Sequence, residues 1–215
     1  MSSLIESYLH RGGDEPLLGS TIPQHFKHIV EQYPDNDAVV CLSQQRRLRY
    51  RELDRAVDEL ARGLVGIGFR KGERIGVWST NNIEWLLLQM ATARIGVILV
   101  NINPAYRARE LNYALQRSEV QGLFLIPAFR SSHYVQMLIE AIPALTDQQP
   151  DNWQHADFPH LRRVIVYDPA QPANTSRPHS GFMLWQEVIA AAEKIAPQQL
   201  DAISAELDQI GRAHV

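Results

Sequence analysis

Hydrophobic residues recur along the chain at the spacings of amphipathic helices and buried strands. Between Leu53 and Leu64 apolar residues follow one another at steps of four, three and four, which is the period of one helix face. The apolar run Arg74 to Trp78 predicts a strand. The nearly continuous apolar stretch from Trp85 to Ile95 predicts a helix packed between layers, and Gly96 is expected to end it.

Apolar runs and amphipathic stretches keep alternating further along the chain. Strands are expected at 97–100, 123–126 and 161–167, the first of them buried, and helices at 107–118, 135–142 and 181–196. Strand and helix thus alternate three times between residues 74 and 142, which is typical of a parallel sheet covered by helices. The predicted fold is therefore α/β, a layered sheet with mainly parallel strands, covering helices and right-handed crossovers.

The segment before this sheet is predicted to contribute a helix and a hairpin. Thr21 can cap a helix whose third position is Gln24. Strands at 38–42 and 46–50 are separated by three turn-forming residues, so they can pair as a hairpin. The second strand alternates arginine with apolar residues, which predicts one solvated face, although an arginine cluster could also bind phosphate.

Two details of the amphipathic helix that contains Leu53 to Leu64 can be tested against a structure. Asp58 and Arg62 stand four residues apart in the favourable order, which predicts an ion pair that stabilises the helix by about 0.3 kcal/mol. Gly66 and Gly68 are expected to supply the left-handed residue that ends the helix.

Composition and charge exclude several functional classes. The 215 residues include 21 Lys and Arg against 24 Asp and Glu, for a formal charge of −3, so no clustered cation excess supports binding to nucleic acid. No secretion signal is visible, and no apolar run reaches the roughly 18 to 20 residues of a transmembrane segment. Cys41, the single cysteine, is expected to be a buried structural thiol. A cytoplasmic protein fits these features best.

A direct search for catalytic motifs assigns no catalytic, cofactor-binding or metal-ligating residue. Glycines 66, 68 and 72 leave a helix to enter a strand, which is the reverse of the order in a dinucleotide-binding fingerprint. The chain contains no G-x-x-x-x-G-K-[ST], H-E-x-x-H or G-x-S-x-G, and its eight histidines show no ligand spacing. Spacing and composition alone therefore indicate only a soluble α/β domain.

Several short motifs nevertheless follow one another in a characteristic order. They are Tyr50 to Leu53 at a helix start, Gly72 to Ile75 at the beginning of a strand, Asn81 to Trp85 at a strand-to-helix junction, and Asn103 to Tyr106 with Glu110 and Leu111 behind it. In this order they resemble the start of an AMP-forming acyl-CoA synthetase of the adenylate-forming superfamily. Residues 127–134 are similar to the fatty-acyl branch, especially medium-chain synthetases, and the resemblance covers about residues 21–200.

The resemblance implies an ATP-dependent fatty-acid–CoA ligase. In such an enzyme a fatty carboxylate attacks the α-phosphorus of Mg·ATP and releases pyrophosphate, and the thiol of coenzyme A then displaces AMP to give the thioester. ATP, Mg and coenzyme A would be substrates of the full-length enzyme. The phosphate loop and the other catalytic groups of the family are expected beyond residue 215, so the chain alone is expected to be an incomplete large N-terminal domain, inactive and without bound cofactors.

Some side chains have both a functional and a structural interpretation. Arginines 107, 109 and 117 could approach a phosphate of coenzyme A, but the favoured interpretation is that they are solvated charges on a helix surface. Trp85, Met90 and Tyr106 could line an acyl pocket, but packing in the core is the favoured interpretation for them.

The expected organisation has three parts. Residues 1–20 form a loosely ordered lead-in, and residues 21–209 form a partial AMP-binding N-terminal domain. Residues 210–215 back-translate into a common sequencing adapter and are expected to be an artefact. Two alternatives stay open, a non-catalytic α/β binding or interaction module and an adenylation domain of a peptide synthetase, which would need a carrier-protein domain downstream.

Overall fold

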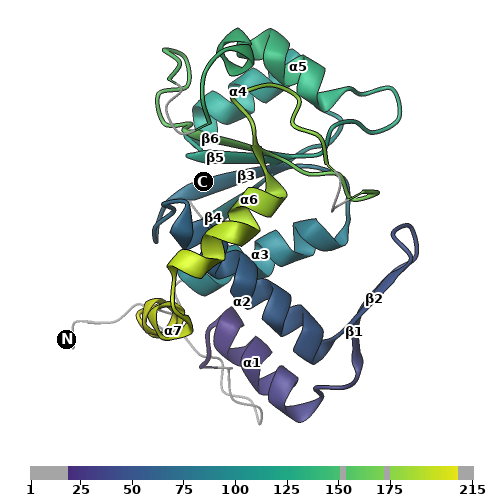
Figure 1. Ribbon diagram of the computed structural model, residues 1–215, viewed down its shortest axis with the longest axis vertical. Helices are drawn as coiled ribbons and strands as arrows, with labels where there is room; N and C mark the ends of the chain where they lie inside the picture. Colours follow the sequence, from purple (N-terminus) through teal and green to yellow (C-terminus); the bar gives the residue numbers. More distant parts are fainter. Residues whose placement is uncertain (1–18, 151–153, 172–174, 208–215) are drawn as a thin grey trace, which may run out of the picture.

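The computed structural model describes residues 19–150, 154–171 and 175–207, so most of the expected lead-in and the expected artefact at 210–215 lie outside the described residues. A five-stranded sheet lies at the centre of the fold, in the order β4-β3-β5-β6-β7 (Figure 1). Its strands are β3 (Arg74–Trp78), β4 (Ile98–Ile102), β5 (Gly122–Leu125), β6 (Arg163–Val166) and β7 (Met183–Leu184). All neighbouring strands are parallel, which confirms the predicted α/β class.

Helices cover both faces of the sheet (Figure 1). On one face lie α1 (Ile22–Gln32), α2 (Tyr50–Gly66), α3 (Ile83–Ile95), α6 (Trp185–Ala190), the short helix η3 (Ala191–Lys194) and α7 (Pro197–Ala205). On the other lie α4 (Ala108–Ser118), α5 (Tyr134–Ala141) and the short helix η1 (Pro143–Thr146). Because parallel strands are buried on both faces, the inner strands consist almost wholly of buried residues.

The two strands β3 and β4 and the helix between them occur where the sequence predicts them. Asn82 caps α3 by accepting a hydrogen bond from the backbone N–H of Trp85 at 2.8 Å, and Gly96 ends the helix with a left-handed φ of 70°. The expectation of a buried strand after Gly96 is wrong in one respect. β4 is the edge strand, so the residues from Ile98 to Val100 are only half-buried.

The predicted N-terminal helix and hairpin are both present. Thr21 and Gln24 form the expected capping box of α1. β1 (Asp37–Cys41) and β2 (Arg46–Arg49) pair antiparallel. Cys41 is half-buried and its sulfur lies 3.3 Å from the Ser43 hydroxyl oxygen, so the prediction of a buried thiol is wrong. The hairpin projects from the body of the molecule (Figure 1), which leaves this strand only partly covered.

The predicted pair of Asp58 and Arg62 is not formed. Arg62 instead donates to the carbonyl oxygens of Ala192 and Ile195, at 3.2 and 3.4 Å, and so fastens α2 to the C-terminal helices. Asp58 faces Arg94, with the carboxylate 2.9 Å from the guanidinium nitrogen Nε. Tertiary partners therefore replace the local pair.

Gly68, and not Gly66, supplies the left-handed residue after α2. Gly68 has a φ of 102°, whereas Gly66 lies inside the helix. Gly63 and Gly66 have a packing role, because they let the α2 backbone approach the C-terminal helices closely. A Cβ atom added at Gly63 would lie 2.2 Å from the Val188 carbonyl oxygen, and one at Gly66 would lie 2.2 Å from that of Ala191.

The single helix predicted over 181–196 is wrong. The strand β7 comes first, because Met183 and Leu184 pair with β6 and extend the sheet. The helix α6 and the tighter helix η3 follow, and α7 begins at Pro197. Pairing with the sheet therefore overrides the helical pattern at the start of this segment.

Charged side chains around the buried Arg94 join four helices on one face of the sheet. Arg94 of α3 is only 4% exposed, and its guanidinium lies within 4.0 Å of the carboxylates of Asp54 and Asp58 on α2 and of Asp201 on α7. Lys27 of α1 also contacts Asp54 and Asp58. Burial raises the pKa of the Asp58 carboxyl, and the nearby cations Arg94 and Lys27 oppose that rise. Such pairing is what makes a buried arginine tolerable.

Replacing Gly63 with alanine is expected to destabilise the chain by about 2 kcal/mol, because the new Cβ would meet backbone that cannot move aside easily. In an ordinary helix interior the same change stabilises by about 1 kcal/mol, so the sign is diagnostic. Urea denaturation measures the effect, with the exposed α2 residue Arg55 changed to alanine as the control. A Gly63→Ala chain as stable as the wild type would contradict the close packing.

Candidate functional site

The topology of the sheet marks one edge as the candidate site. β4 lies on one side of β3 and β5 on the other, so the chain changes direction between them. In open α/β sheets, ligands bind outside the carboxyl ends of the strands at such a switch point. Here β3 leads into Ser79 and β5 into Ile126, and the neighbouring β6 leads into Tyr167. We call this region the carboxyl edge.

A tight polar turn connects β3 to α3 at the carboxyl edge. The Asn82 amide nitrogen donates to the Ser79 hydroxyl oxygen and to the Thr80 carbonyl oxygen, both at 2.8 Å. The amide oxygen of Asn82 caps the helix. One asparagine thus fixes the turn and satisfies a free N–H at the start of α3.

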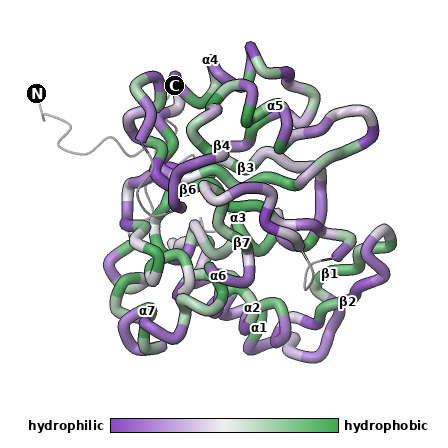
Figure 2. Tube along the Cα trace, turned by 45° about the horizontal axis from the view of Figure 1, so that its top comes forward, coloured by the Kyte–Doolittle hydropathy of each residue, from purple (hydrophilic) through white to green (hydrophobic). Residues whose placement is uncertain are grey.

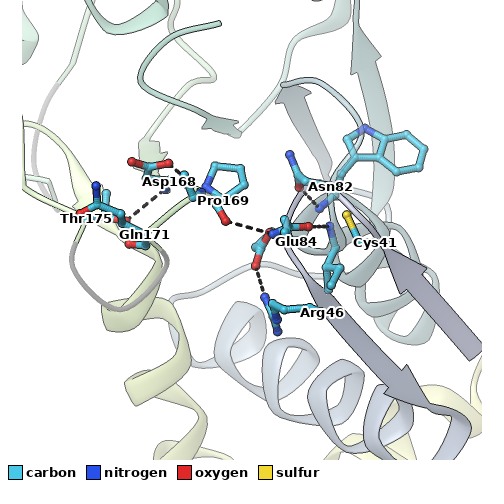
Figure 3. A network of polar contacts seen from close by, with 12 residues as sticks. Cys41, Arg46, Asn82, Glu84, Asp168, Pro169, Gln171 and Thr175 are labelled. Atoms are coloured by element: carbon cyan, nitrogen blue, oxygen red, sulfur yellow. Dashed lines mark hydrogen bonds and ion pairs between the residues drawn. The ribbon is translucent and has the colours of Figure 1, made fainter. Parts of the chain in front are cut away.

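A buried carboxylate lies in the first turn of α3. Glu84 is 3% exposed and accepts hydrogen bonds from Arg46 and Gln44, each at 2.8 Å (Figure 3). Gln44 also donates to the Pro169 carbonyl oxygen at 3.1 Å and accepts from the Ile83 N–H at 2.8 Å. This network joins the hairpin, α3 and the loop after β6. The Glu84 charge is matched by Arg46, as a buried carboxylate requires.

Tyr167 follows β6 and is 1% exposed. Burial raises the pKa of its hydroxyl far above the usual range, and the neighbouring Ser79 and Asn82 side chains oppose part of the rise. Among the described residues its hydroxyl oxygen has no hydrogen-bond partner of normal geometry. Tyr167 is therefore a neutral packing residue at physiological pH.

An aromatic stack holds the turn after β4. Trp78 and Tyr134 stack with ring centroids 4.3 Å apart. The Trp78 indole N–H donates to the Asn103 carbonyl oxygen at 3.2 Å, and the Tyr134 hydroxyl donates to that of Pro104 at 2.7 Å. Burial raises the pKa of Tyr134, with Arg107 opposing the rise. The segment starting at Asn103 is the most specific motif of the sequence. It is thus a turn that is held by hydrogen bonds from Trp78 on β3 and Tyr134 on α5.

The side chains that had both a functional and a structural interpretation take no part in these side-chain hydrogen bonds. Arg107, Arg109 and Arg117 are exposed at or on α4, and Trp85, Met90 and Tyr106 are half-buried against the core, as their packing interpretation requires. No group of three or more histidine, cysteine, aspartate or glutamate side chains is placed for a metal within the described residues. The carboxyl edge therefore offers hydroxyls, amides and one neutralised carboxylate, which suit positioning and hydrogen bonding.

Sequence reasoning assigned none of the residues gathered at the carboxyl edge. Ser79 directly follows a predicted strand, Tyr167 is the last residue of another, and Asn82 belongs to the motif at a predicted strand-to-helix junction. Polar residues immediately after buried strands were the available signal. No such signal in the sequence indicated that Gln44 of the distant hairpin would bind Glu84.

Comparison with known proteins decides the family. The sequence pattern of the AMP-binding enzymes matches residues 26–202. The chain belongs to this family. It is similar to the medium-chain acyl-CoA ligase ACSF2, mitochondrial, of Danio rerio, with 34% identity over 205 residues that cover 95% of this chain and 32% of that protein. The Homo sapiens protein of the same name is 34% identical over 197 residues, or 92% of this chain and 30% of the relative.

The chain spans about a third of the length of these two relatives. Among solved structures, coronafacic acid ligase from Pectobacterium brasiliense has a TM-score of 0.61 at 17% identity, over 80% of this chain and 29% of that one. That likeness shows the fold. No helix among the described residues is long and apolar enough to cross a membrane.

Two tyrosines at the carboxyl edge form a matched pair for testing these contacts. Tyr134→Phe is expected to cost about 1 kcal/mol, because it leaves the Pro104 carbonyl oxygen without its donor. Tyr167→Phe is expected to cost less, because the Tyr167 hydroxyl has the Ser79 and Asn82 side chains as neighbours but makes no hydrogen bond of normal geometry with them. Urea denaturation of both variants measures the difference, and equal effects would contradict the assigned contacts.

Proposed function

We propose that the chain is the N-terminal part of an ATP-dependent fatty-acid–CoA ligase. The observation that carries the proposal is the 34% identity to a medium-chain acyl-CoA ligase over 95% of this chain. The family membership and the shared fold agree with it. Fatty acids are the proposed acyl substrates because the relatives' names and residues 127–134 both point to that branch.

The proposed reaction makes a poor electrophile reactive in two steps. An oxygen of the fatty carboxylate attacks the α-phosphorus of ATP, which forms an acyl adenylate and releases pyrophosphate. The thiol of coenzyme A then attacks the acyl carbon, loses its proton and displaces AMP, which leaves the thioester. The first step replaces a bad leaving group, oxide, with a good one, AMP, and the second step expels that AMP.

The described residues do not suit the metal that accompanies ATP. They contain no cluster of three metal-ligating side chains, and the Glu84 carboxylate is already engaged by Arg46 and Gln44. We therefore assign no step through magnesium to the described residues, and we propose that the catalytic and nucleotide-binding groups of the family lie outside them.

The role proposed for the chain itself is to position the reacting groups of the ligase. The carboxyl edge is held by hydrogen bonds and ion pairs that reach from the hairpin to the loop after β6, so it forms a rigid border. On its own the chain is proposed to make no thioester. The cytoplasmic location stays a prediction, because the names of the similar ACSF2 proteins place those proteins in mitochondria.

Reading the source locus beyond codon 215 tests the proposal at the level of the gene. A reading frame that continues into a glycine-rich phosphate loop supports the ligase. A genuine stop codon near residue 209 would instead support a non-catalytic module, and a downstream carrier-protein domain would support a peptide synthetase.

An assay of the uninterrupted gene product tests the chemistry. We expect AMP release that depends on fatty acid, ATP and coenzyme A together with an acyl-CoA product detected by mass spectrometry, and faster turnover with medium-chain acids than with acetate. Adenylation of amino acids without thioester formation on coenzyme A would contradict the proposed substrate class.

A further inference from the structure

A groove with apolar walls lies between α1 and the two helices beside it, α2 and α3. It has a volume of about 380 Å³, and none of the described residues that line it is an aspartate, glutamate, lysine or arginine. Its apolar lining residues are Ile22, Phe26, Ile29, Tyr50 and Met90. Helix α1 mixes hydrophobic and hydrophilic positions along its length (Figure 2), and three of the hydrophobic ones face this groove. The groove therefore suits an apolar occupant.

The groove is packed at its base and open at its wall. Phe26 is buried, and the centroid of its ring lies 6.5 Å from that of Tyr50. Ile22 is one helical turn before Phe26 on the same side of α1, yet it is 67% exposed. An amphipathic helix normally covers the residues of its apolar side. Ile22 therefore marks the part of the groove that the described residues leave uncovered.

The chain enters the described fold at the rim of this groove. Ser20, Thr21 and His25 are its polar lining residues, and residues 1–18 directly precede Gly19, the first described residue. A segment on a short tether is present at an effective concentration on the order of millimolar, an advantage that a separate molecule lacks. Connectivity therefore favours residues 1–18 as the occupant.

The sequence of this segment carries a matching apolar pattern. Its first apolar residues after Met1 have the spacing that places them on one side of a helix. They are Leu4, Ile5, Tyr8 and Leu9. Ser3 and Glu6 have the spacing of a capping box, and Gly12 follows as a helix end signal. The groove thus offers the apolar part of the expected lead-in a place to pack.

The stretch between this pattern and the groove is long enough for the chain to turn back. Residues 12–18 include two glycines and a proline, which favour turns. Seven residues can span up to about 23 Å. That reach is more than twice the roughly 8–10 Å that separate packed helices. Residues 4–9 can therefore return over α1 and reach the groove.

We propose that residues 4–9 pack into the groove between α1, α2 and α3 and cover Ile22. Tyr8 is the one aromatic residue among residues 1–18, and the groove is small enough that an occupant approaches Met90 on its wall. A methionine sulfur beside an aromatic ring makes a favourable contact. The packing completes the apolar side of α1 and fixes the path by which the chain enters the fold. It does not depend on the proposed ligase reaction.

Methyl NMR signals of the methionines in the 215-residue chain test this packing. Met90 lines the groove, whereas Met137 lies on α5 and Met183 on β7. Tyr8→Ala is expected to shift the Met90 signal, because the ring current of the tyrosine is lost. The other two signals should stay in place, which shows that the fold is retained. Tyr8→Phe keeps an aromatic ring and should keep the Met90 signal close to that of the wild type.

A matched control removes an aromatic ring elsewhere on the surface. Tyr113 on α4 is 69% exposed and is not part of the groove lining. Tyr113→Ala is therefore expected to leave the Met90 signal unchanged.

A nitroxide label gives a second measurement that does not rely on a ring current. Cys41→Ser removes the single cysteine, and Ser7→Cys then accepts the label beside the apolar pattern. We expect strong broadening of the Met90 signal and little broadening of Met137, which lies on the opposite face of the sheet (Figure 1). The same chain with the label reduced is the control.

Three results would overturn the proposal. One is a Met90 signal that does not change in Tyr8→Ala, and another is broadening that is no stronger at Met90 than at Met137. Either would leave the groove to another occupant. The third is a set of effects that vanish on tenfold dilution, since these would assign the groove to the segment of a second copy.

Discussion

The whole architecture depends on burying both faces of a parallel sheet. The inner strands offer no polar face to water, so helices must cover each side. The chain meets this constraint with α4 and α5 on one side and the helices around α2 on the other. Gly63 and Gly66 make the second layer compact, because they bring the α2 backbone against α6 and η3. The crossover order then sets the switch point at β3.

That order explains why the polar residues of the fold gather at the carboxyl edge. The turns after the strands are the places where the buried sheet ends and hydrogen-bonding groups can appear. Asn82 caps the helix after β3, and the Trp78–Tyr134 stack holds the turn after β4. Glu84 extends the network to the hairpin. These contacts give this member of the AMP-binding family a firmly held carboxyl edge.

Local patterns predicted those parts of the fold that depend on local physics. The Thr21 capping box and the alternation of strands and helices between residues 74 and 142 both follow from spacing and end signals. Errors arose where distant contacts decide: β7 exists because β6 pairs with it, and Cys41 is half-buried because its hairpin projects. The carboxyl edge was missed for the same reason, since only the folded topology brings Gln44 to Glu84.

We propose that this chain supplies framework and not reactive groups. A direct measurement is titration of the folded 215-residue chain with Mg·ATP in the presence of a medium-chain fatty acid, followed by calorimetry and by analysis for AMP. We expect neither saturable heat of binding nor release of AMP. Saturable nucleotide binding accompanied by AMP that depends on the fatty acid would contradict this role, because the 215 residues would then contain an adenylation site.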